Sequence, residues 1–407
     1  MTHLDSRQSW IRLGAIMALS TLGGAGMWSV VVALPFVQAE FGATRADASL
    51  PYTLTMVGFA AGGILMGRLS DRFGAMIPVM AASCVMGIGY ILAGMAPSLM
   101  WFALVQGVLI GALGSSASFG PLMADASMWF LRRRGIAVAL AASGNYLAGV
   151  VWPPLLTVLI GNRGWRVAHI VVGCIVLVTM PLIALMLRAR PPVAKVVPPV
   201  AGAPPPRAER PLGMSKNTLT GVLGFAGIGC CIAMAMPQVH IVAYCGDLGY
   251  GVARGTEMLS LMLAFGIVSR IASGFIADRI GGLRTLLLGS LLQGAALVMY
   301  LGFDSLFSLY VISALFGLFQ GGIVPSYAII VREYFPAREA GTRLGIVLMA
   351  TLAGMAIGGW VSGFIFDLTG SYAAAFLNGV AWNLVNVIIV TTLLIRAQGL
   401  RGRAAMA

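Results

Sequence analysis

Charge is scarce in this sequence, and acidic charge is the scarcest. Only 10% of the 407 residues are charged, with 13 acidic against 26 basic side chains. Soluble globular domains carry about 25% charged residues. This shortage, with 59% hydrophobic residues and a mean hydropathy of +0.93, excludes an ordinary soluble protein and indicates an integral membrane protein.

Residues that build metal centres and catalytic sites are also few. The five cysteines and three histidines show no metal-ligand spacing, so no metal or cofactor is predicted. No glycine-rich phosphate loop and no Ser-His-Asp arrangement occurs, and the polar loops are too short to contain an ATPase domain. We therefore expect neither an enzyme nor a primary pump.

Long apolar runs dominate instead. A run of roughly 20 apolar residues spans a bilayer core as a helix, and we identify twelve, centred near residues 25, 58, 86, 114, 147, 177, 232, 265, 292, 320, 353 and 383. The first run is too long for a cleaved signal peptide and is expected to remain as an anchor. The predicted fold class is an all-α membrane protein with 12 transmembrane helices.

The basic residues predict the orientation of these helices. With both termini in the cytoplasm, most Lys and Arg side chains fall in cytoplasmic segments, as the positive-inside rule requires. The net charge of +13 thus reflects topology and contact with lipid headgroups, and nucleic-acid binding is not expected. Four arginines fall in the outside loops: Arg45, Arg163, Arg166 and Arg254.

A proline-rich segment divides the chain. Residues 190–211 contain eight prolines and are basic, which predicts an extended linker. We place an N-terminal six-helix bundle at 1–189, a cytoplasmic linker at 190–215 and a C-terminal six-helix bundle at 216–407.

The two halves are related by an internal repeat. GRLSDRFG at 67–74 recurs as GFIADRIG at 274–281, an offset of 207 residues, and the same offset aligns 40–48 with 247–255. WFLRRRGIAVALAASGNYLAG at 129–149 resembles 334–354 at an offset of 205. Parallel repeats of six helices are the plan of one large class of secondary transporters.

These motifs resemble the major facilitator superfamily. Both copies match its G-x-x-x-D-R-x-G loop, for which the resemblance implies a cytoplasmic latch between helix ends. An acid on the fourth helix, here Asp125, would pair with the motif arginine Arg72; a proton-relay role for Asp125 is the alternative. The expected latch residues are Gly67, Asp71, Arg72, Asp125, Asp278 and Arg279.

Residues 129–149 further resemble the fifth-helix signature of the monocarboxylate transporter family, and 23–37 resembles its first-helix signature. Arg270 falls where that family has a carboxylate-binding arginine on the eighth helix. Two features of that family are missing. The family has an aspartate four residues before the arginine, where this sequence has Gly266, and the first-helix lysine of its animal members has no counterpart here.

Arg270 is also unusual on physical grounds. Eight residues separate it from Asp278 at the helix end, which places it about 12 Å into the membrane. A charge at the bilayer centre costs roughly 2.5–3.5 kcal/mol on insertion scales. Its repeat counterpart is Gly63, so folding of the repeat does not require the charge. A guanidinium suits a carboxylate, so we expect anion binding, with a structural ion pair as the alternative.

His240, whose repeat counterpart is Ala33, is the second asymmetric residue. A histidine beside a cavity can transfer a proton, so His240 and Arg270 are candidates for proton coupling; His240 could equally serve only as a hydrogen-bond partner. The remaining candidates are mid-depth side chains on helices that line the cavity in this architecture, and each could instead be packing: Trp28, Phe119, Asn145, Tyr146, Gln320 and Tyr327.

The predicted function is secondary transport of a small organic monocarboxylate, such as lactate or pyruvate, by proton symport with alternating access. The partners would be that anion, protons and the lipid bilayer, and the protein is expected to be a monomer in a bacterial inner membrane. The alternatives are an oxalate/formate-type anion exchanger, a drug efflux pump and a non-transporting receptor. An exchanger of dicarboxylates would need a second cation, which the eleventh helix lacks, and an efflux pump would have a buried acid.

Overall fold

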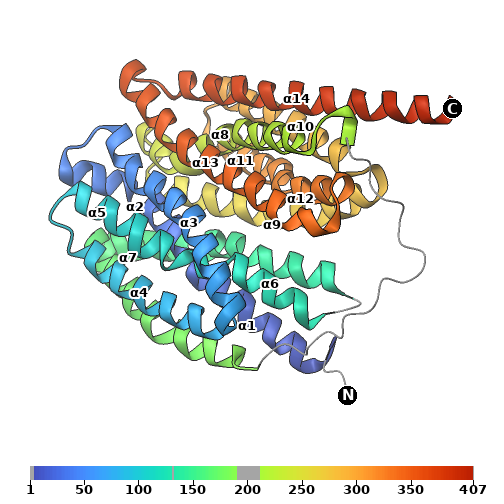
Figure 1. Cartoon of the computed structure of the whole chain (residues 1–407). Helices are drawn as coiled ribbons and strands as arrows, with labels where there is room; N and C mark the ends of the chain where they lie inside the picture. Colours follow the sequence, from blue (N-terminus) through green and yellow to red (C-terminus); the bar gives the residue numbers. More distant parts are fainter. Residues whose placement is uncertain (1–3, 131–132, 190–210, 407) are drawn as a thin grey trace.

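The computed structural model describes residues 4–130, 133–189 and 211–406, which form helices joined by short turns (Figure 1). The first half contains α1 (Arg7–Gly23), α2 (Ala25–Phe41), α3 (Arg45–Phe73), α4 (Met76–Gly94), α5 (Leu99–Val105), a π-helix η1 (Gln106–Ala112), a 3₁₀ turn η2 (Ser115–Ser118), α6 (Gly120–Trp129), α7 (Arg134–Ala184) and a second 3₁₀ turn η3 (Leu185–Leu187).

The second half repeats this plan. After a short 3₁₀ turn η4 (Pro211–Gly213), it contains α8 (Lys216–Asp247), α9 (Val252–Ile280), α10 (Gly282–Gly302), α11 (Leu306–Gln320), α12 (Ile323–Tyr334), α13 (Ala337–Thr369) and α14 (Tyr372–Met406). Most of the predicted linker, residues 190–210, lies outside the described residues, so its boundaries stay a prediction.

The described helices account for the twelve predicted spans. Eleven helical stretches are long and apolar enough to cross a membrane, and the longest, Ile136–Leu187, has 52 residues. That length is about twice what one crossing needs. The stretch is interrupted at Gly164, whose φ of 77° and ψ of 161° are not helical. It therefore makes two passes, and the fold is the predicted all-helical membrane fold.

Two spans are broken at equivalent points of the repeat. The fourth span passes from α5 through η1 and η2 into α6, and the tenth span is divided between α11 and α12. Gly114 and Gly321, which are 207 residues apart, lie in the two breaks. A Cβ on Gly321 would lie 2.3 Å from the carbonyl oxygen of Gly266, so the break brings α9 and the tenth span into close backbone contact.

Figure 1 shows the helices of each half lying together, with α1–α7 below and α8–α14 above. The start of α1 and the end of α14 lie at the same end of the molecule, which we call the terminal end. The turn between α2 and α3 lies at the opposite end, which we call the far end.

The repeated motif ends α3 and α9 in the same way. Gly74 and Gly281 follow these helices with φ values of 79° and 85°, and each backbone N–H donates to the carbonyl four residues earlier. Glycine adopts a positive φ without the Cβ clash that other residues meet. The last glycine of each copy is therefore explained by backbone geometry.

Candidate functional site

Arg270 lies at the seam between the two halves. It projects from α9 of the second half, and its Nη1 donates to the carbonyl oxygen of Ala142 on α7 of the first half at 3.0 Å. The guanidinium carbon stands 3.9 Å from the ring centroid of Tyr146, also on α7. The side chain is half-buried and points toward the other half.

The charge of Arg270 has few partners. The cation–π contact with Tyr146 offsets part of the burial cost. Among the described side chains no acid forms an ion pair with Arg270, and its Nε is buried without a hydrogen-bond partner. A guanidinium has five N–H donors in a planar fork, so donors remain for a carboxylate.

Gly266 explains how Tyr146 comes to lie under Arg270. A Cβ at position 266 would be 2.4 Å from Cε1 of Tyr146, far inside van der Waals contact. The monocarboxylate transporter family, which the sequence resembles, has an aspartate at this position. That side chain could not coexist with the Tyr146 ring as it lies here. The ring thus replaces an acid as the immediate neighbour of the arginine.

Three further predicted residues lie on the first-half side. Trp28 donates from Nε1 to the carbonyl oxygen of Asn145 at 3.2 Å, which ties α2 to the turn of α7 that carries Tyr146. Phe119 lies at the break of the fourth span, half-buried and 6.0 Å from the ring of Phe59. Trp28, Asn145 and Tyr146 therefore form one neighbourhood.

Gln320 ends α11 and lies on the second-half side. Its Oε1 accepts from Nε2 of Gln238 on α8 at 2.9 Å, whereas its own Nε2 is buried without a partner. An unpaired buried amide donor is costly unless something fills the position. Gln320 therefore keeps one donor available among the described residues.

Two predicted residues are engaged inside the second half. The Tyr327 hydroxyl donates to Oδ1 of Asn386 on α14 at 3.2 Å. His240 Nε2 donates to the carbonyl oxygen of Gly359 on α13 at 2.8 Å, and the Tyr372 hydroxyl lies 3.4 Å from Nδ1. Both side chains are fully buried; His240 has polar partners on α13 and α14, and Tyr327 has one on α14.

The expected pairing of Asp125 with Arg72 is wrong. Asp125 binds Arg12 of α1 through two hydrogen bonds of 2.7 and 2.8 Å, both side chains being buried. Arg12 lies inside α1, beyond its first turn, and its buried charge needs an acid. The four charged motif side chains are exposed: Asp71, Arg72, Asp278 and Arg279.

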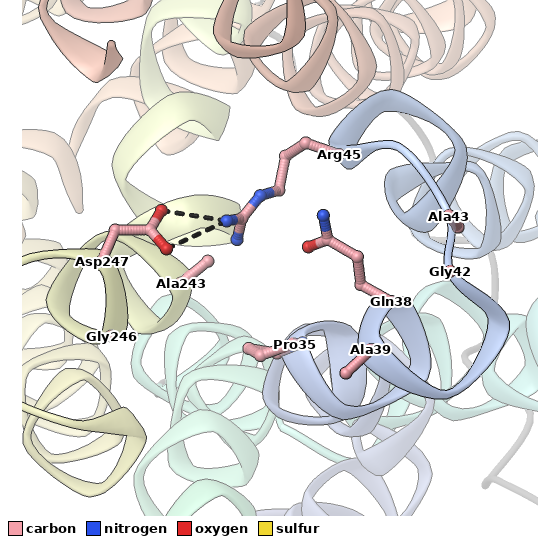
Figure 2. Close-up of a pocket in the computed structure, with 9 residues that line it drawn as sticks. All are labelled: Pro35, Gln38, Ala39, Gly42, Ala43, Arg45, Ala243, Gly246 and Asp247. Atoms are coloured by element: carbon pink, nitrogen blue, oxygen red, sulfur yellow. Dashed lines mark hydrogen bonds and ion pairs between the residues drawn. The ribbon is translucent and has the colours of Figure 1, made fainter. Parts of the chain in front are cut away.

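Sequence reasoning also missed a charged cluster at the far end. Arg45, counted above as an outside-loop arginine, is buried at the start of α3 and binds Asp247 of α8, across the seam, at 2.9 Å (Figure 2). Asp367 of α13 accepts from the backbone N–H groups of Arg45 and Ala46 at 2.8 and 2.7 Å. The repeat carried a signal: Glu40, the counterpart of Asp247, pairs with Arg166 inside the first half.

Known proteins resemble the chain over most of its length. The model of the Major Facilitator Superfamily matches residues 16–306 and 258–405. Monocarboxylate transporter 13 of Bos taurus is 30% identical over 343 residues, covering 80% of this chain and 75% of that protein. Monocarboxylate transporter 11 of Mus musculus is 29% identical over 389 residues, covering 92% and 84%.

A solved structure agrees in fold. A bacterial homolog of the human lysosomal transporter Spinster, in an inward-facing and occupied conformation, superposes with a TM-score of 0.74 at 15% identity, covering 95% of this chain and 96% of that one. Sequence and fold thus agree that the chain belongs to the major facilitator superfamily and is a secondary transporter, not an enzyme.

Proposed function

We propose that this transporter carries a small organic monocarboxylate whose carboxylate binds Arg270. The observation that carries the proposal is a half-buried guanidinium at the seam, with a buried Nε that has no partner and no acid paired to it among the described side chains. The similarity to two monocarboxylate transporters supports the same class of cargo.

The surroundings of Arg270 favour a cargo that is small and partly apolar. Tyr146 covers one face of the guanidinium, and Trp28 and Asn145 belong to the same neighbourhood of α2 and α7. Gln320 adds an amide donor at the end of α11, suited to a hydroxyl or keto oxygen. A single cation matches a single carboxylate.

Binding at the seam links the cargo to the movement of the halves. Arg270 belongs to the second half and its partners Ala142 and Tyr146 to the first. A carboxylate neutralises the guanidinium, which lowers the cost of enclosing it when the halves close around it. A ligand shifts a conformational equilibrium only through such a difference in binding between states.

Symport with a proton is the mode we favour. His240, the first candidate proton carrier, is hydrogen-bonded within the second half. Because His240 already has these partners, we favour the other route, in which the proton and the carboxylate enter together at Arg270. The termini face the cytoplasm of a bacterial cell in this proposal, so the far end faces outward.

Uptake of a labelled-acid panel into proteoliposomes, with and without an acid gradient, tests this function. Arg270→Ala should abolish uptake and Arg270→Lys should reduce it strongly, because a lysine lacks the planar fork. Arg254→Ala, an exposed arginine on the same helix, is the matched control and should transport normally. Uptake that requires unlabelled acid inside the proteoliposomes and does not respond to the gradient would indicate exchange and not symport.

Uptake near the wild-type rate by Arg270→Ala, with the protein folded in the membrane, would refute the assignment. If no monocarboxylate in the panel is transported, but another anion is and its uptake is lost in Arg270→Ala, the arginine serves that other anion and the cargo class proposed here is wrong.

A further inference from the structure

The far end is held by a charged cluster that joins the halves, which we call the Arg45 clasp: Arg45, Asp247 and Asp367. Arg45 Nη2 donates to both carboxylate oxygens of Asp247, at 3.1 and 2.9 Å. Rings of Phe366 and Tyr372 lie 4.9 and 5.8 Å from the guanidinium carbon and hold it in place. The acids and both rings come from the second half, whereas Arg45 comes from the first.

The two charges of the Arg45–Asp247 pair differ in their access to water. The Arg45 side chain is 8% exposed and that of Asp247 is 41% exposed. Asp247 can lose its partner and stay hydrated. Arg45 cannot, because an uncompensated buried charge is strongly unfavourable. The buried guanidinium therefore needs a carboxylate at all times, but that carboxylate need not belong to Asp247.

Asp247 also leaves some nitrogen donors of the Arg45 guanidinium without a hydrogen bond. Both of its oxygens share one nitrogen, Nη2, and Nε is buried with no hydrogen-bond partner among the described residues. A carboxylate that is not tethered to the backbone of α8 could bind two nitrogens side by side, which is the stronger geometry for this pair of groups.

A cavity gives such a carboxylate room. It has a volume of about 350 Å³ and is bounded by α2, the α2–α3 turn and the end of α8. Figure 2 shows the Arg45 guanidinium lying between the Asp247 carboxylate and the Gln38 amide, and all three residues line the same space. Ala39, Gly42 and Gly246 on its rim are exposed, so the space is reached from solvent.

We propose that this cavity is an entry site for the cargo, in which the carboxylate of the incoming acid displaces Asp247 from Arg45. Displacement removes one charged link between the halves, so arrival of cargo loosens the far end and leaves the backbone bonds to Asp367 as the remaining part of the clasp. The proposal rests on a monocarboxylate cargo, but it assigns a second site that is separate from Arg270.

Calorimetric titration of full-length protein in nanodiscs with pyruvate tests the site. All variants carry Arg270→Ala, so that the seam site is disabled and only the entry site is measured. Asp247→Asn removes the competing carboxylate and should tighten pyruvate binding about tenfold, because a charged competitor and a like charge are both lost. Arg45→Gln should abolish binding.

Glu40→Gln is the matched control. It also removes an acid from an arginine at the far end, but its partner Arg166 lies in the same half, so pyruvate binding should not change. If Arg45→Gln does not fold, Arg45→Lys replaces it and should weaken binding, since a lysine cannot bind two oxygens as a fork.

The proposal requires both changes. The entry site is overturned if pyruvate binds equally well with and without Asp247→Asn. It is also overturned if pyruvate still binds to the Arg45→Gln variant. Failure of the seam site is seen separately, as normal uptake by the Arg270→Ala single variant.

Discussion

Arg270 and Arg45 are both cations at the seam, but they are satisfied differently. Arg45 has Asp247 as a counter-ion, whereas Arg270 rests on the Tyr146 ring and one backbone carbonyl. The ring attracts the cation without neutralising it. At the scale of single residues, Arg45 already has a carboxylate partner, whereas Arg270 has none among the described side chains.

Gly266 offers a test at this scale. Gly266→Ala places a Cβ 2.4 Å from Tyr146 Cε1 and should displace the ring from beneath Arg270. We expect uptake to fall at least about tenfold and stability to fall by about 1–3 kcal/mol, as overpacking does. Uptake and thermal melting measure both effects.

Gly161→Ala on α7 is the control, because a Cβ there meets nothing within 4 Å. Wild-type uptake by Gly266→Ala would show that the position of the Tyr146 ring does not matter for transport.

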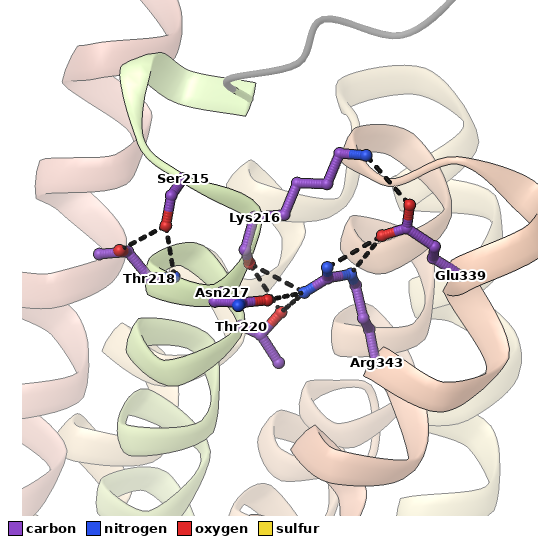
Figure 3. Close-up of polar contacts among 7 residues, drawn as sticks. All are labelled: Ser215, Lys216, Asn217, Thr218, Thr220, Glu339 and Arg343. Carbon is purple, nitrogen blue, oxygen red and sulfur yellow. Dashed lines mark hydrogen bonds and ion pairs between the residues drawn. The ribbon is translucent and has the colours of Figure 1, made fainter.

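Helix junctions at the terminal end are fixed by small polar networks. Figure 3 shows Arg343 of α13 reaching the start of α8, where it donates to the carbonyl oxygen of Lys216 and to Thr220 at 3.1 and 2.7 Å. Glu339 lies between Arg343 and Lys216, at 2.9 and 3.0 Å. The hydrogen bond from Arg343, and then that from Lys216, hold the pKa of Glu339 below its usual value.

This junction predicts a pH dependence of stability at the scale of helices. A lowered pKa in the folded state means that Glu339 stabilises the fold above its unfolded pKa, and that this contribution is lost as the pH falls through the folded value. Glu339→Gln should therefore lower the melting temperature equally at pH 7 and pH 6, and the difference should vanish in acid.

A double-mutant cycle that combines Glu339→Gln with Arg343→Gln isolates the interaction free energy between Glu339 and Arg343. The Glu339→Gln effect should shrink when Arg343 is already replaced. A difference that instead grows on acidification contradicts the assigned pairing.

The whole molecule is closed at the far end. Among the described residues, four sets of hydrogen bonds join the halves between that end and Arg270: the Arg45 clasp, Thr53 to the carbonyl of Ala356, Thr157 to Thr256, and Arg270 to Ala142. The charged side chains of both motif copies are exposed at the terminal end. These bonds hold the two halves together from the far end to Arg270.

Proton coupling is a property of the whole molecule, because it concerns the complete transport cycle. His240→Gln should leave the stimulation of uptake by an acid gradient unchanged, since both ring nitrogens already have second-half partners. The loss of one buried hydrogen bond should cost about 1 kcal/mol of stability. The ratio of uptake with and without the gradient measures the coupling.

Tyr372→Phe, which removes the hydroxyl beside Nδ1, should behave in the same way. Loss of the gradient effect in His240→Gln, with uptake otherwise intact, would instead assign the proton to the histidine.

The sequence by itself determined the membrane class, the twelve spans, the internal repeat and the place of Arg270 inside an apolar run. Each of these follows from composition, hydrophobic run length or repeat spacing, which are properties of the chain taken in order. The motif glycines Gly74 and Gly281 belong here too, because a helix end with positive φ is a local requirement.

Only the tertiary structure decided which charges meet. Asp125 binds Arg12, 113 residues away, and Arg45 binds Asp247, 202 residues away. Tyr327 and His240 turned inward, and Tyr146 took the place beside Arg270 that Gly266 leaves open. Pairing of this kind depends on how the helices are rotated and packed against each other. A periodicity of apolar residues places a helix in the membrane but leaves the partner of each polar side chain open.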